Sequence, residues 1–95
     1  ASGRCAAAPF AAPDYRPISQ VEAALNGSLR VAARARDALY VDLAAASRGH
    51  DICAGKAAWV NGAQMKPGRA AAYHPYARGM RGATDAVLGA LSGRG

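Results

Sequence analysis

Few residues in this 95-residue chain could carry chemistry, and the clearest of them is His74. It stands before Pro75, whose missing N–H and fixed φ suit the first turn of a helix. The apolar residues that follow recur at spacings near three and four: Met80, Ala83, Val87, Leu88 and Leu91. The pattern predicts a helix over residues 75–91 with His74 just before its N-terminus. There the side chain either faces a cleft or is a helix cap or solvated loop residue.

His50, Asp51 and Cys53 form a second group of reactive side chains. A zinc site would add Cys5 and His74 to this group, because thiolates and imidazoles are zinc ligands. Only His50 and Cys53 are close in sequence, so the spacing does not fit a compact zinc knuckle and we expect no metal. A cysteine nucleophile is a further alternative, but neither cysteine has a surrounding motif, and a disulfide would disable both.

If His74 is a general base, it needs a hydroxyl nucleophile and an acceptor that orients its ring. No serine lies in a strand-to-helix turn between glycines, the setting that exposes and activates a serine. The serines are Ser2, Ser19, Ser28, Ser47 and Ser92. Ala71, not an aspartate, stands three residues before His74. We therefore expect the nucleophile to lie outside this chain.

Composition and charge restrict the class of protein. Hydrophobic residues make up 52% of the chain, but most of them are alanine, so a core built from this chain alone would be thin. The net charge of +6 suits an anionic partner, yet the arginines are scattered and no aromatic platform is interleaved with them, which argues against nucleic acid. No apolar run approaches the roughly twenty residues of a transmembrane helix.

The first third of the chain contains an arm and a helix. Three prolines among alanines, without a sustained period, predict a connecting arm over residues 1–18. Ser19 and Glu22 have the form of a capping box, which predicts a helix over residues 19–36.

The middle of the chain contains one strand and a long irregular segment. Residues 39–43 are β-branched and aromatic with an alternating pattern, which predicts a strand. Residues 44–72 are loop-like, and a loop of this length is usually functional or pinned. Because one strand with two helices cannot make a closed α/β layer, we expect the chain to be part of a larger α/β domain.

The chain has two cysteines, Cys5 and Cys53. If they pair, the closed loop contributes about 4 kcal/mol of stability in the chain-entropy treatment. A disulfide would also place the protein in an oxidising, secreted setting.

Four short motifs resemble a known family. They are Tyr40-Val41-Asp42-Leu43, Gly49-His50-Asp51-Ile52-Cys53, Trp59-Val60-Asn61-Gly62 and His74-Pro75-x-x-x-Gly79-Met80. Their order and approximate spacing resemble the C-terminal segment of secreted bacterial SGNH (GDSL-type) hydrolases, which are serine esterases, lipases and phospholipases. The resemblance covers nearly the whole chain.

The resemblance implies that residues 1–95 are the C-terminal part of a single hydrolase domain with a flavodoxin-like three-layer α/β/α fold. It implies a carboxylic ester hydrolase that works without a cofactor, with His74 as the general base of a Ser–His pair. The backbone carbonyl of Ala71 or Ala72 would orient the ring in place of an aspartate. The Gly-Asp-Ser nucleophile and the oxyanion hole have no counterpart here, so either a complementary N-terminal chain would carry them or this chain is a fragment of the complete hydrolase. We adopt the first alternative, and in either case this chain alone would be inactive.

The same resemblance implies further roles. Cys5 and Cys53 match a disulfide of the secreted branch, which implies a secreted, extracellular protein. Trp59 and Asn61 match the segment beside the active site and would line the pocket for an ester or lipid. The family's His-Pro-Asn reads His74-Pro75-Tyr76 here, which removes a side chain expected to steady the turn.

A rival hypothesis assigns no enzymatic role. The chain would then be a small basic module that binds an anionic partner through its arginines. Rising salt would weaken such binding steeply, whereas ester hydrolysis would not respond in this way.

Overall fold

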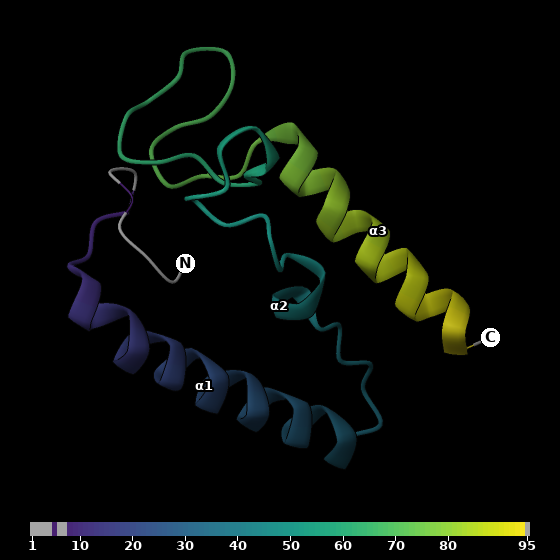
Figure 1. Cartoon of the computed structure of the whole chain (residues 1–95). Coiled ribbons are helices and arrows are strands. Elements are labelled where there is room, and N and C mark those ends of the chain that lie inside the picture. Colours follow the sequence, from purple (N-terminus) through teal and green to yellow (C-terminus); the bar gives the residue numbers. More distant parts are fainter. Residues whose placement is uncertain (1–4, 6–7, 95) are drawn as a thin grey trace.

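A computed structural model describes Cys5 and residues 8–94 of the chain. These residues form two long helices and three short ones joined by irregular segments (Figure 1). The elements are η1 (Ala12–Asp14), α1 (Tyr15–Ala35), α2 (Leu43–Ala46), η2 (Gly55–Ala57) and α3 (Ala77–Arg94). The pairing between extended segments in this part of the chain is limited to two isolated β-bridges, Val60 with Pro75 and Lys66 with Ala70.

The helix α1 begins four residues before the predicted start at Ser19. The Asp14 carboxylate accepts a hydrogen bond from the Ala11 N–H (3.1 Å) and fixes the turn that leads into the helix. Pro17 lies in the first turn, where its missing N–H leaves no bond unmade. Ser19 therefore lies inside the helix and not at its N-cap.

The predicted strand over residues 39–43 and the flavodoxin-like three-layer α/β/α fold are both wrong, because the described residues contain no sheet. Leu43 begins α2, and Asp42 caps that helix by accepting a hydrogen bond from the Ala45 N–H (2.9 Å). Residues 38–42 have no neighbouring strand in the described part of the chain. A strand obtains its ladder of hydrogen bonds only from such a neighbour, so this segment stays irregular.

The later elements also differ at their ends from the predicted ones. The segment expected to be loops over residues 44–72 contains α2 and η2. The last helix, predicted over residues 75–91, is α3 and begins at Ala77 because Pro75 is still paired with Val60. It extends to Arg94.

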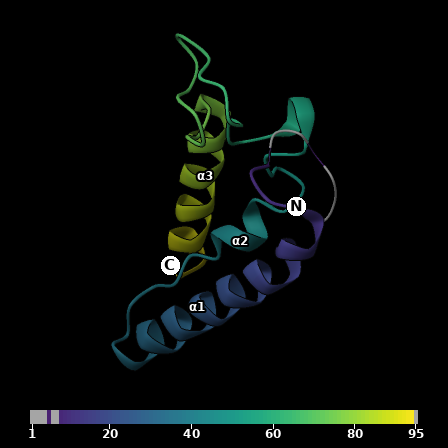
Figure 2. The ribbon, with the colours of Figure 1, turned by 90° about the vertical axis from the view of Figure 1, so that its left-hand side faces the viewer.

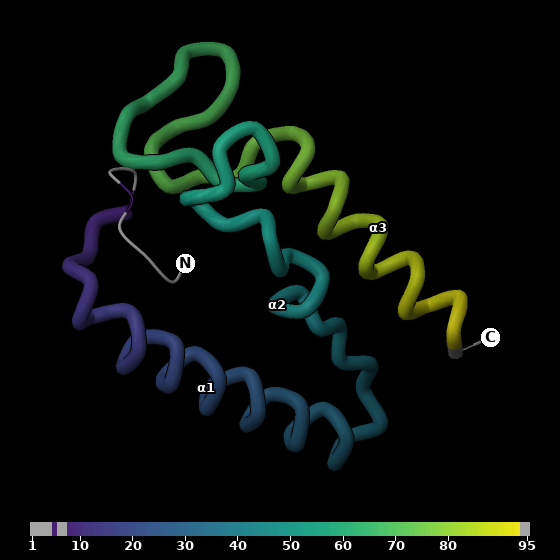
Figure 3. Tube along the Cα trace, viewed as in Figure 1, coloured from purple at the N-terminus to yellow at the C-terminus, as the bar shows by residue number. Residues whose placement is uncertain are grey.

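The helices are spread apart. In Figure 1, α1 and α3 lie apart, and α2 lies between them; Figure 2 shows that the two long helices are inclined to each other. α2 packs against α3, whereas α1 packs against neither of these helices within the described chain. The tube in Figure 3 shows the segment between η2 and α3 as a wide loop that returns to the start of α3. Irregular chain, and not a sheet, therefore positions the candidate site.

One face of α1 is apolar and is left uncovered by the described chain. Val21, Leu25 and Leu29 share that face and remain 70%, 58% and 51% exposed. The accessible surface is 6886 Å², whereas a compact protein of this mass would expose about 5100 Å². The radius of gyration is 15.0 Å, against about 12 Å for a compact domain of this length. The chain by itself leaves apolar surface available for a partner.

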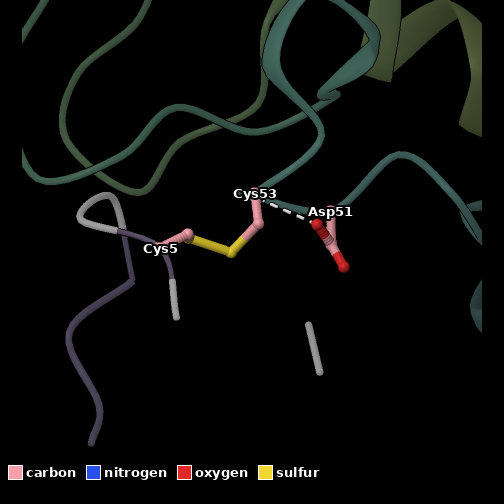
Figure 4. The surroundings of a disulfide bond; sticks show 3 residues. All are labelled: Cys5, Asp51 and Cys53. Atoms are coloured by element: carbon pink, nitrogen blue, oxygen red, sulfur yellow. Dashed lines mark hydrogen bonds between the residues drawn. A yellow bond between two sulfur atoms is a disulfide. The ribbon is translucent and has the colours of Figure 1, made fainter. Parts of the chain in front are cut away.

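The predicted disulfide between Cys5 and Cys53 is confirmed. It joins residues 48 positions apart, with Cα atoms 5.7 Å from each other. Figure 4 shows that it ties the N-terminal segment to the loop after Asp51, whose carboxylate accepts a hydrogen bond from the Cys53 N–H (2.8 Å). A disulfide suits an oxidising setting such as the extracellular space. None of the helices in the described part of the chain combines the length and apolar character that crossing a bilayer needs.

Replacing both cysteines with serine is expected to lower the free energy of unfolding by about 4 kcal/mol, the chain-entropy value for a loop of this size. The pair Cys5→Ser and Cys53→Ser removes the bond and keeps the polarity of the sites. Urea unfolding followed by circular dichroism measures the change. A urea midpoint equal to that of the unreduced wild type would contradict the pairing.

Candidate active site

His74 lies exposed in the turn before α3. Its Nδ1 is 2.7 Å from the carbonyl oxygen of Ala72. In the tautomer that this bond requires, Nδ1 carries the proton and Nε2 keeps its lone pair. The carbonyl of Ala71, the other predicted acceptor, instead accepts from the backbone N–H of His74 (3.2 Å) and from the Asn61 side chain (3.1 Å). The ring is thus oriented, and Nε2 is the nitrogen able to accept a proton.

The backbone on either side of His74 is held by a short antiparallel pairing. The N–H of Asn61 donates to the His74 carbonyl (2.9 Å). The N–H of Tyr73 donates to the Gly62 carbonyl (3.1 Å). Tyr73 has a φ of 59°, a left-handed conformation that is uncommon outside glycine. The pairing therefore holds a strained residue directly beside the candidate base.

Asn61 is the most buried polar residue of the described chain, with 1% of its surface exposed. Its side-chain amide donates to three backbone carbonyls, those of Gln64 (2.7 Å), Ala70 (3.1 Å) and Ala71 (3.1 Å). Its Oδ1 accepts from the Tyr76 hydroxyl (2.9 Å). These bonds engage both polar atoms of the side chain, so Asn61 positions the loop around His74 and leaves no polar atom turned toward a substrate.

Tyr76 supports the turn at His74, although the family resemblance implied that a supporting side chain is missing at position 76. Its side chain is buried, with 5% exposed, and its hydroxyl donates to Asn61 and accepts from Lys66 Nζ (2.7 Å). Its backbone N–H donates to the Trp59 carbonyl (2.8 Å). The sequence reasoning missed this role. An aromatic residue directly before a helix in a loop poor in apolar side chains is the signal that could have found it.

Trp59 packs between the loop and α3. Its ring stacks on His50, with centroids 4.4 Å apart and planes inclined by 15°. His50 is held in turn by the Ala57 carbonyl, which lies 2.8 Å from its Nδ1. Trp59 fits against α3 because Gly79 and Gly82 have no side chains where its backbone and ring approach.

The four residues weighed as zinc ligands do not form a set of ligands. Both sulfur atoms belong to the disulfide, and a disulfide sulfur is not a thiolate. His50 is engaged by a carbonyl and by the Trp59 ring. In the described part of the chain, no group of three or more His, Cys, Asp or Glu side chains could hold a metal ion.

A groove of about 680 Å³, which we call the apolar groove, lies between the start of α1, the segment over residues 47–60 and the start of α3. Its walls include Phe10, Ile18, Leu43, Trp59, Tyr73 and Pro75. The last two flank His74, so the candidate base lies beside the groove. Trp59 lines the apolar groove, whereas Asn61 lines a separate hollow.

The described residues do not bring a serine to His74. The hydroxyls of Ser28 and Ser47 donate to backbone carbonyls of their own helices or turns. Ser19 lines the apolar groove, but no serine hydroxyl in residues 8–94 is hydrogen-bonded to His74. The geometry therefore contains an oriented base and no nucleophile for it.

Comparisons with protein-family models, with curated proteins and with solved structures yield no match for this chain. The resemblance to SGNH hydrolases accordingly rests on the four motifs, and the activity that it implies is a proposal.

Replacing Asn61 with alanine is expected to lower the free energy of unfolding by about 3 kcal/mol, because three carbonyls and the Tyr76 hydroxyl lose a buried partner. The matched control is Asn26→Ala in α1, whose carboxamide makes no hydrogen bond within the described chain. That change should stay within about 0.5 kcal/mol. Urea unfolding measures both, and equal losses would contradict the proposed role of Asn61.

Two glycines of α3 provide a second matched pair. A Cβ on Gly79 would overlap the Trp59 backbone, whereas a Cβ on Gly89 meets nothing within 4 Å. Gly79→Ala is expected to lower the free energy of unfolding by about 2 kcal/mol through overpacking. Gly89→Ala is expected to raise it by about 0.5–1 kcal/mol through helix propensity. Thermal unfolding with Trp59 fluorescence distinguishes the two, and stabilisation by both would contradict the close approach.

Proposed function

We propose that this chain supplies the general base of a secreted serine ester hydrolase. His74 would accept the proton of a serine carried by a complementary N-terminal chain. The observation that carries the proposal is the hydrogen bond from His74 Nδ1–H to the Ala72 carbonyl (2.7 Å) on an exposed ring. A base oriented in this way presents Nε2 to a group that approaches from outside.

A backbone carbonyl is a sufficient orienting group for this chemistry. It selects the tautomer and the direction of the ring, as a carboxylate does, but it stabilises the imidazolium less because it carries no full charge. The pairing of Asn61 with His74 and of Tyr73 with Gly62 holds the backbone in place. The ring therefore does not depend on an acidic residue for its position.

The apolar groove supports an ester with a hydrophobic acyl group as the substrate. Its volume of about 680 Å³ lies within the range of small-molecule sites, and its walls are mostly aliphatic and aromatic. Tyr73 and Pro75 form one of these walls and flank the base. An acyl chain lying in the groove would bring its ester carbonyl to the His74 end.

The reaction would proceed in two balanced halves. His74 Nε2 takes the proton of the serine hydroxyl while the serine oxygen attacks the ester carbonyl carbon. The bond from that carbon to the alcohol oxygen then breaks, and the imidazolium returns the proton to the leaving alcohol. In the second half, His74 deprotonates a water molecule, whose oxygen attacks the acyl-enzyme, and the proton returns to the serine as the acid leaves.

The uncovered face of α1 supports the presence of a complementary chain. Val21, Leu25 and Leu29 lie in one row and are more than half exposed. An apolar row of this length normally lies against another polypeptide. The complementary chain would supply the serine and the oxyanion donors, and the 95-residue chain alone should not hydrolyse p-nitrophenyl esters above the rate in buffer.

The test uses native, unreduced material treated with a fluorophosphonate, which reacts with activated serines. Intact-mass spectrometry should find the label on a second polypeptide that contains Gly-Asp-Ser. In the complete protein, His74→Ala should lower kcat/KM for a p-nitrophenyl ester about 10³-fold or more. Ser28→Ala is the control, because Ser28 lies on α1 and its hydroxyl bonds to Ala24.

Two outcomes would contradict the proposal. One is a fluorophosphonate label on a serine of this chain. The other is activity in the complete protein that His74→Ala leaves unchanged.

A further inference from the structure

Three cationic side chains converge on one buried ring. Lys66 Nζ, the Arg69 guanidinium and the Arg78 guanidinium lie 5.3, 5.2 and 4.2 Å from the centroid of Tyr76. Together with Lys56 they line a polar hollow of about 640 Å³, which we call the basic hollow. Like charges gathered in this way repel one another unless an anion lies among them.

The described part of the chain places no acidic side chain in the basic hollow. Among the described residues that line it there is no Asp or Glu. In the described chain, Arg30 and Asp42 form an ion pair (2.9 Å), and neither residue lines the hollow. The positive charge of the hollow is therefore not neutralised by a carboxylate of residues 8–94.

The backbone brings two of these cations, Lys66 and Arg69, close together, although both residues are exposed. Lys66 and Arg69 occupy the two ends of a turn in which the Arg69 N–H donates to the Lys66 carbonyl (2.9 Å). Pro67 and Gly68, with a φ of 75° at Gly68, have the features of a type II turn. This turn brings the side chains of its first and last residues to the same side of the loop.

Side-chain hydrogen bonds hold two of the cations, Lys66 and Arg78. Lys66 Nζ donates to the Tyr76 hydroxyl (2.7 Å), which is itself bonded to buried Asn61. Arg78 donates through Nε to the Ala58 carbonyl (2.6 Å). These contacts use one donor of Lys66 and one of Arg78, whereas lysine has three N–H donors and arginine five. The remaining donors are preorganised for a ligand with several acceptor oxygens.

We propose that the basic hollow binds a phosphoryl group carried by a small molecule. A tetrahedral dianion accepts several hydrogen bonds at once and matches a cluster of two guanidinium groups and an ammonium group better than a single carboxylate does. The site is distinct from the apolar groove and does not involve His74. Ile52 and Val60 line both, so the two sites share part of their walls.

The test titrates the ¹⁵N-labelled chain with inorganic phosphate, using sodium chloride at equal ionic strength as the reference. The amide signals of Arg69, Tyr76 and Arg78 should shift and saturate. Arg69→Gln should weaken phosphate binding about tenfold, because it removes a charge-assisted pair. The matched control is Arg81→Gln, which removes the same charge from an exposed position on α3 and should weaken binding less than about twofold.

Further binding experiments identify the molecule that carries the phosphoryl group. Saturable binding of glycerol 3-phosphate would support a soluble phosphate ester. Binding to phosphatidylglycerol vesicles that is lost in Arg69→Gln would support a lipid headgroup. Arg69→Lys, which keeps the charge but not the planar fork, should give an intermediate loss. If Arg69→Gln fails to fold, displacement of phosphate from the wild type by sulfate still tests the site.

The proposal would be overturned by linear, non-saturating shifts in every arm, or by equal losses in Arg69→Gln and Arg81→Gln. Its failure is separable from that of the proposed hydrolase. His74→Ala should leave phosphate affinity unchanged, and Arg69→Gln does not alter the candidate base.

Discussion

The buried carboxamide of Asn61 is the constraint on which the described structure depends. A polar side chain removed from water must satisfy its donors and acceptors, and Asn61 does so with three carbonyls of one loop and the hydroxyl of Tyr76. The described chain has few buried apolar side chains, Ala58 and Tyr76 among them. The path of the loop between η2 and α3 is therefore determined by hydrogen bonds more than by a hydrophobic core.

This network also determines what His74 can do. The backbone of residues 59–62 pairs with the backbone on both sides of His74. The Ala72 carbonyl then orients the His74 ring. A carbonyl gives direction without a full negative charge, so it selects the tautomer of the ring but would stabilise an imidazolium less than a carboxylate would. Trp59 links this turn to α3, where Gly79 and Gly82 allow its close approach.

The two hollows of the molecule differ in chemical character although they share a wall. The apolar groove is lined mostly by aliphatic and aromatic side chains near His74, whereas the basic hollow is lined by four cations, three of which lie around Tyr76. Both are open, and the surface of α1 is uncovered. A chain with this much accessible surface would gain stability if a partner covered part of that surface.

The sequence by itself determined the two long helices, through their apolar periods, and the presence of a histidine directly before the last one. It did not determine the strand expected over residues 39–43, because a strand exists only with a neighbour and none is present in the described chain. The start of α1 depended on the turn at Asp14. The roles of Tyr76 and Asn61 include the side-chain contacts of Tyr76 with Lys66 and with Asn61, ten and fifteen positions away. The gathering of the three cations around Tyr76 likewise depends on the path of the loop. Only the tertiary structure decides such contacts, because no local pattern records which distant side chains meet.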